Sequence, residues 1–141
     1  MEALNAAALP AGALLLVDSA PIIYTLEANE RFAQRFAPLF QRHAMGELVI
    51  AVTTITIAEV LTGPLKAGEE VLAKRYRAVL DSWQVVDFTS DIAESAARLR
   101  GTYGLKLPDA IQLASALEIN AHALVTHDRD FAQVRGMRVL G

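Results

Sequence analysis

Apolar and polar positions along the chain form two kinds of pattern. Short apolar runs, each typical of a buried strand, occur at residues 13–17, 47–53, 83–88, 123–126 and 137–140. Segments with helical spacing of apolar residues separate these runs. Because strands alternate with helices and do not show simple polar/apolar alternation, we expect an α/β fold: a three-layer α/β/α sandwich with a mostly parallel sheet of about five strands.

The helical segments carry recognisable boundary signals. Pro38 interrupts the first segment and should kink that helix or begin a second one. Asp91, with Glu94 three residues later, suggests a capping box for a helix that closes near Gly104. Pro108 suits the first position of another helix. The segments with helical periodicity are residues 32–43, 65–80, 91–103 and 107–121.

Length and composition narrow the class of protein. The 141 residues, 53% of them hydrophobic and 21% charged, suffice for a single domain that covers residues 1–141 with a sizeable core. The absence of cysteine excludes disulfides and thiolate metal sites, and we expect a cytoplasmic location. The apolar start carries Glu2, has no basic residue before Arg31, and is interrupted by Pro10, so we expect neither a secretory signal nor a membrane span.

Acidic residues follow two of the predicted strands. Asp18 directly follows the run at 13–17, and Asp128 and Asp130 follow the run at 123–126. Glu59 lies in an otherwise apolar or hydroxylic segment, and Asp109 lies in the first turn of an apolar helix. Ligand sites of open parallel sheets lie beyond the carboxyl ends of the strands. We therefore expect these acids to meet at one edge of the sheet.

Each acid also has an ordinary structural interpretation. Asp18 could cap a helix, Glu59 could lie on a helix surface, and Asp109 could pair with a helix dipole. Asp128 could be a turn residue, and Asp130 could cap a short helix. Their shared placement at strand ends and helix starts favours a cluster instead. Carboxylates crowded together need a compensating hard cation, and acids spread widely along the sequence suit Mg²⁺ or Mn²⁺ better than a calcium loop does.

Four stretches of the sequence carry a resemblance to a known family. In order they are "LLVDSAPIIYTLE", "ITIAEVLTGPLKAGE", "LKLPDAIQLASAL" and "LVTHDRDF", and together they span nearly the whole chain. The chain resembles PIN-domain ribonucleases of the VapC toxin type. Many relatives carry Asn two residues after the first acid, where this chain has Ala20. The resemblance implies the following roles: Asp18, Glu59, Asp109 and Asp128 as the catalytic acids, Asp18, Asp109, Asp128 and Asp130 as metal ligands, and Ser19 and Thr126 as supporting residues.

The resemblance also implies an activity and partners. Such proteins are Mg²⁺- or Mn²⁺-dependent endoribonucleases, form homodimers, and are the toxic half of a toxin–antitoxin pair silenced by a cognate antitoxin. A non-catalytic RNA-binding module of the same fold is an alternative. A magnesium-dependent phosphatase is another, although Ala20 stands where its second aspartate would be expected. The apolar segments at 55–65 and 32–40 could supply a dimer surface or belong to the core.

The formal net charge of −3 argues only weakly against a nucleic-acid partner. The chain has 16 acids and 13 Lys plus Arg residues, so setting aside the five site acids leaves 11 acids and an excess of two positive charges. His127, beside Asp128, could touch a phosphate. The bases expected near an RNA backbone, which solvated helix faces explain equally well, are Arg31, Arg35 and Arg42 on one segment and Lys74, Arg75 and Arg77 on another.

Overall fold

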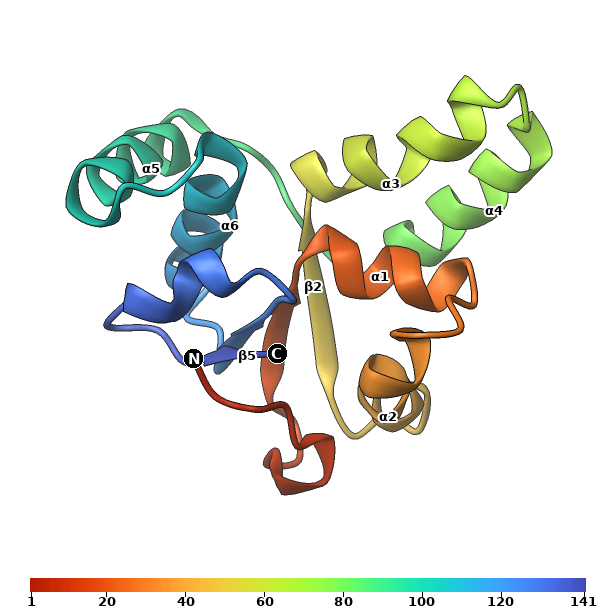
Figure 1. The fold of residues 1–141 in the computed structure, drawn as a ribbon, viewed down its shortest axis with the longest axis horizontal. Coiled ribbons are helices and arrows are strands. Elements are labelled where there is room, and N and C mark those ends of the chain that lie inside the picture. Colours follow the sequence, from red (N-terminus) through yellow and green to blue (C-terminus); the bar gives the residue numbers. More distant parts are fainter.

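A five-stranded parallel sheet lies between two layers of helices (Figure 1). The computed structural model describes all 141 residues. All four strand pairings are parallel, which confirms the expected fold class. The strands, in the spatial order β3-β2-β1-β4-β5, are β1 (Leu14–Val17), β2 (Val49–Thr53), β3 (Gln84–Val86), β4 (Ala123–Val125) and β5 (Val139–Leu140).

The two faces of the sheet build two separate cores. Leu15 and Val17 of β1 face one core, whereas Leu16 between them faces the other. Both sets are fully buried, because helices cover each face and leave no polar side to the central strands. The first core packs against α1 (Ser19–Leu26), α2 (Ala33–Ala44), α3 (Thr54–Lys66) and α4 (Glu70–Asp81), and the second against α5 (Ser90–Tyr103), α6 (Leu107–Glu118) and the short 3₁₀ helix η2 (Arg129–Gln133).

Two helix predictions were wrong. The segment at 65–80 is not one helix, because α3 begins at Thr54 and ends at Lys66, and α4 begins only at Glu70. Gly68, with a φ of +74°, makes the turn between them, a backbone conformation that glycine adopts without strain. The expected capping box is also absent: the hydroxyl of Thr89, not Asp91, accepts the hydrogen bond from the amide of Ile92 that caps α5.

The helix that contains Pro38 is continuous. Helix α2 runs from Ala33 to Ala44 with Pro38 inside it, so this proline does not begin a second helix. Phe36 and Leu39 of this helix are fully buried, which accounts for part of the apolar segment at 32–40 as core. None of the helices combines the length and apolar character that crossing a lipid bilayer would need.

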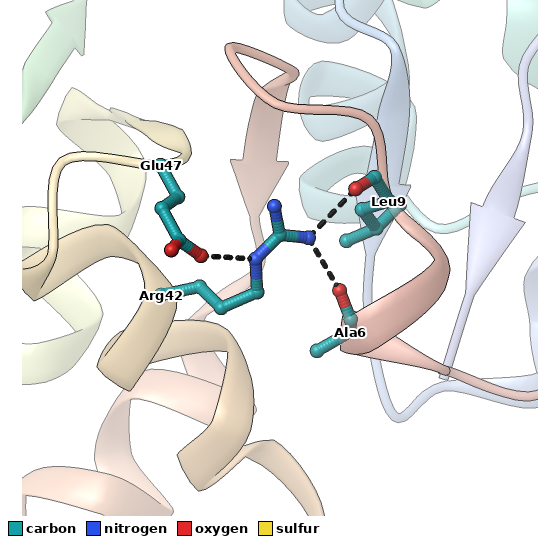
Figure 2. Close-up of polar contacts among 4 residues, drawn as sticks. All are labelled: Ala6, Leu9, Arg42 and Glu47. Atoms are coloured by element: carbon teal, nitrogen blue, oxygen red, sulfur yellow. Dashed lines mark hydrogen bonds and ion pairs between the residues drawn. The ribbon is translucent and has the colours of Figure 1, made fainter.

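Arg42 fastens the start of the chain to α2 (Figure 2). Its Nε donates to Oε2 of Glu47 at 2.7 Å, and its Nη1 donates to the carbonyl oxygens of Ala6 and Leu9, each at 2.7 Å. Ala6 belongs to the 3₁₀ helix η1 (Ala6–Ala8), which packs on the first core. The guanidinium of Arg42 is therefore engaged in structural contacts, and its place near an RNA backbone stays a prediction.

The topology brings distant segments to one edge of the sheet. From β1 the chain moves outward to β2 and β3, then returns to β4 on the other side of β1. The strand order therefore reverses between β1 and β4, and crevices at such switch points bind ligands. Asp18 follows β1 and Thr126 follows β4, so both lie at this point.

Candidate active site

Asp18 lies at the centre of a set of converging donors. It precedes α1, and its Oδ1 accepts hydrogen bonds from the amide of Ser19 at 2.8 Å and from Nε2 of Gln112 at 2.9 Å. Its Oδ2 accepts from the hydroxyl of Thr126 at 2.9 Å. These donors come from α1, α6 and the end of β4, so three elements hold one carboxylate in a fixed orientation.

Asp109, Asp128 and Asp130 form a second group of carboxylates. One oxygen from each lies within 4.8 Å of the others. Asp109 comes from the first turn of α6, whereas Asp128 caps η2 by accepting from the amide of Asp130 at 2.8 Å. The amide of Asp128 donates to the hydroxyl of Thr126 at 3.0 Å, so Thr126 links this group to Asp18. Of the five acids expected to meet, Asp109, Asp128 and Asp130 form this group, and Asp18 is connected to it through Thr126 and through its charge, which acts on Asp109.

The environment of Asp109 favours its neutral form. The residue is only 9% exposed. Burial, followed by the negative charges of Asp128 and Asp18, raises its pKa from 3.8 to about 7. The charge of Asp130, and a hydrogen bond to Asp128, act on this pKa in the same direction. No positive charge of the protein opposes this increase, so the protein by itself does not compensate an ionised cluster.

The donor set of this cluster fits a divalent cation. Oδ2 of Asp109 is buried and has no hydrogen-bond partner in the protein. A buried carboxylate oxygen without a partner is costly, and a cation that binds oxygen ligands would remove that cost. Asp109, Asp128 and Asp130 supply carboxylate oxygens only, which is the ligand chemistry that Mg²⁺ and Mn²⁺ prefer.

Glu59 lies on the other side of Asp18. It projects from α3, and its Oε1 accepts a hydrogen bond from the hydroxyl of Ser19 at 2.9 Å. Burial raises its pKa, the Ser19 hydrogen bond opposes this, and the charge of Asp18 adds to the increase. Glu59 is thus joined to Asp18 through Ser19 but is not one of the three carboxylates within 4.8 Å of one another.

Gln112 is a site residue that the sequence interpretation missed. Its side chain is 1% exposed and donates from Nε2 to Asp18 at 2.9 Å and to the hydroxyl of Thr56 at 2.8 Å. Its Oε1 accepts from the hydroxyl of Thr53 at 2.9 Å, which fixes the orientation of the amide. One signal was available: Gln112 lies three residues after Asp109 and therefore on the same side of an otherwise apolar helix.

The expected RNA-binding bases differ in their surroundings. Arg77 pairs with Asp81, as Arg42 does with Glu47. The four that remain are exposed and form no ion pair: Arg31, Arg35, Lys74 and Arg75.

His127 lies near the first two of these bases. The hydroxyl of Tyr24 lies 3.0 Å from its Nδ1. Burial, and then the charges of Arg35, Arg129 and Arg31, lower the pKa of His127.

Comparison with known proteins agrees with this architecture. The fold and site define an α/β protein with a carboxylate cluster at the switch point of a parallel sheet. The family model of the PIN domain matches residues 15–137. The chain therefore belongs to the PIN-domain family. A search of curated proteins found no match.

Solved structures include a relative from a toxin–antitoxin complex. That structure, from Klebsiella pneumoniae, has 32% identity and a TM-score of 0.70, and the match covers 90% of this chain and 96% of that one. VapBC2 from Rickettsia felis, bound to a DNA fragment, matches with 18% identity and a TM-score of 0.71 over 89% and 96% of the two chains. VapC20 from Mycobacterium tuberculosis, described as a Sarcin-Ricin loop cleaving toxin, matches with 17% identity and a TM-score of 0.66 over 84% and 92%. The resemblance to PIN domains of the VapC type is confirmed.

Proposed function

We propose that this protein is a Mg²⁺- or Mn²⁺-dependent endoribonuclease and the toxin of a toxin–antitoxin pair. Membership of the PIN-domain family and the Klebsiella relative from a toxin–antitoxin complex support this class. The observation that carries the proposal is the state of Asp109: a buried acid with an unpartnered oxygen, surrounded by other carboxylates. Such a cluster is unfavourable without a cation and becomes a site for one when ionised.

The acids then divide into two roles. Asp18, Asp109 and Asp128 would hold the cation, with Asp130 as a further ligand. Bound divalent ions of this kind polarise a phosphodiester and lower the pKa of water. Glu59, held by Ser19, would orient the attacking water and accept its proton, and burial, which raises its pKa, makes its carboxylate a stronger base.

Hydrolysis by water determines the products. If water attacks the phosphorus, the RNA strands end in a 5′-phosphate and a 3′-hydroxyl, and the neighbouring 2′-hydroxyl takes no part. An RNA with a single 2′-deoxy substitution at the cut site should still be cleaved. Gel analysis of such an oligonucleotide beside its all-RNA counterpart tests this, and protection by the substitution would refute attack by water.

A variant series tests the activity itself. Purified wild-type protein, Asp18→Asn and Asp109→Asn should be incubated with RNA and Mn²⁺. We expect cleavage by the wild type and by the matched control Asp91→Asn, which changes an exposed acid of α5, and no cleavage by Asp18→Asn or Asp109→Asn. Equal RNA loss in all four samples would show a contaminating nuclease and remove the support for this site.

The partners follow from the same assignment. We infer that RNA is the substrate, that a cognate antitoxin silences the protein, and that the chain forms a homodimer. Arg31 and Arg35 on one side, and Lys74 and Arg75 on α4, are the bases proposed to contact the RNA backbone. Sedimentation of the isolated chain checks the dimer, since a monomer at micromolar concentration would exclude it.

A further inference from the structure

A basic cavity lies beside the acid cluster, and of the residues that line it the proposed function uses only Arg35. It has a volume of about 330 Å³, and Arg35, His127 and Arg129 line it together with Glu2 and Gly141. His127 precedes Asp128 in the chain, so the cavity and the proposed cation site lie on neighbouring residues of one loop after β4. We call the cavity defined by Arg35, His127 and Arg129 the basic cavity.

The positive charge of the basic cavity is not neutralised within the protein. Neither Arg35 nor Arg129 belongs to any of the four ion pairs of the structure. Glu2 is the one acid in the lining, and Arg138 already binds it with Nε–Oε2 and Nη2–Oε1 distances of 2.8 and 3.3 Å. Arg129 therefore lines a concave surface without a partner acid, and Arg35 shares only the main-chain oxygen of Gly141, the last residue of the sequence, an arrangement that favours an anionic ligand.

Contacts within and around the cavity fix the geometry of its lining. Arg35 donates from Nη2 to the carbonyl oxygen of Gly141 at 2.6 Å, so most of its N–H groups remain available. The ring of His127 packs edge-on against Phe32, with ring centroids 4.6 Å apart. The Tyr24 hydroxyl lies against Nδ1 of His127. With Tyr24 as the donor, Nε2 carries the hydrogen, and it becomes a third donor for a ligand in the cavity.

We propose that the basic cavity binds a backbone phosphate of the RNA strand next to the bond that is cut. This inference rests on the proposed function and adds a subsite to it. An RNA strand whose scissile phosphate lies at Asp128 would have its neighbouring phosphates within reach of the adjacent residues of the same loop. Arginine forks are suited to phosphate oxygens, and the cavity holds two of them beside a neutral donor. The cavity therefore fixes the strand on one side of the cut.

Salt dependence of RNA binding provides the test. A fluorescent single-stranded RNA should be titrated in EDTA, where no cleavage occurs, over a series of KCl concentrations. Each phosphate neutralised on a single strand contributes about 0.7 to the slope of log K against log salt. We expect Arg35→Gln/Arg129→Gln to reduce the slope by about 0.7 and to weaken binding several-fold at low salt, while the Mn²⁺ affinity of the protein stays at the wild-type value.

Two variants separate a phosphate contact from a structural effect. Arg35→Lys/Arg129→Lys keeps the charge and should keep the wild-type slope. Arg77→Gln/Arg98→Gln removes the same charge from arginines already paired with Asp81 and Glu94, and should leave the slope unchanged. Calorimetry with inorganic phosphate should show no tight binding to the wild type, because the proposed ligand is part of a strand.

The outcomes distinguish this inference from the proposed function. A wild-type slope in the Arg35→Gln/Arg129→Gln variant, or an equal loss in the Arg77→Gln/Arg98→Gln control, would overturn the subsite while leaving the nuclease intact. Tight binding of inorganic phosphate that is lost in the Gln variant would indicate a site for free phosphate and would also overturn it. A wild-type protein that bound no RNA at all would overturn both.

Discussion

Gln112 is the strongest test of how the site is held together. Replacement by Met keeps an unbranched side chain of similar length and removes three hydrogen bonds, to Asp18, Thr53 and Thr56. Two neutral bonds contribute about 1 kcal/mol each, and the bond to the carboxylate about 1.5–3 kcal/mol. Because Met buries no polar amide, the folded variant regains about 1–3 kcal/mol of stability. We therefore expect Gln112→Met to lower the free energy of unfolding by about 2 kcal/mol.

The effect on cation binding should be similar in size to this loss of stability. Asp18 keeps its contacts to Ser19 and Thr126 but loses the donor that fixes Oδ1 from α6. Loss of a residue that orients a metal ligand typically lowers metal affinity by about 10–100-fold. Titration with Mn²⁺, followed by electron paramagnetic resonance or calorimetry, should show a decrease in this range for Gln112→Met.

A second substitution on the same helix separates positioning from packing. Ser115 is 1% exposed, and its hydroxyl donates only to the carbonyl oxygen of Ile111 within α6. Ser115→Ala should therefore cost some stability in urea unfolding and leave Mn²⁺ affinity unchanged. Wild-type affinity in Gln112→Met, or the same loss in both variants, would refute the role assigned to Gln112.

Three further predictions concern charge, anchoring and capping. Without divalent ions, the pKa of Asp109 is about 7 in the folded protein, compared with an ordinary value of 3.8. Its contribution to the free energy of unfolding should therefore fall as pH rises from about 4 to 7, by on the order of 4 kcal/mol. Urea unfolding of the wild type and of Asp109→Asn across this pH range should show the difference. Arg42→Met loses three charged hydrogen bonds and should lower the unfolding free energy by about 3 kcal/mol with Mn²⁺ binding unchanged, as calorimetry checks. Thr89→Ala should lower the free energy of unfolding measured in urea by about 1 kcal/mol, and Asp91→Ala should lower it by less, because only Thr89 caps α5. An equal loss of unfolding free energy in the two α5 variants would indicate that Asp91 caps the helix as well.

The existence of the five strands could be predicted because apolar runs are a strong local signal. Each of the five predicted runs contains an observed strand, although β5 is only Val139–Leu140 where the run at 137–140 was longer. Helix boundaries were less predictable, because several residues can serve each end. Asp91 and Thr89 are both good caps, and only the backbone amide of Ile92 shows which one is used.

The acids of the site could be predicted, but their partners could not. Asp18, Asp109 and Asp128 stand out because carboxylates at strand ends and in apolar helices need an explanation. Gln112 does not stand out in the same way, since an uncharged amide in a helix needs no special account. That it donates to Asp18, 94 residues earlier, is a consequence of how α6 packs across the end of β1.

The roles of the basic residues were harder to predict from the sequence than those of the acids. Arg42 and Arg35 lie on the same helix, and neither their spacing nor their charge distinguishes them. Arg42 meets three acceptors and is used to anchor the chain, whereas Arg35 meets one carbonyl and faces the basic cavity. A basic residue is free for a ligand only when the fold offers it no acid, and that is a property of the folded surface.

Stability and function therefore oppose each other at one edge of the sheet. Burial and three neighbouring carboxylates raise the pKa of Asp109, so the metal-free protein is strained there at neutral pH and above. The donors around Asp18 keep its carboxylate in place under that repulsion, and cation binding by the ionised cluster would release protons and return stability. We therefore expect Mn²⁺ to raise the unfolding midpoint more at pH 8 than at pH 5, because at pH 5 Asp109 keeps its proton and the proton competes with the cation.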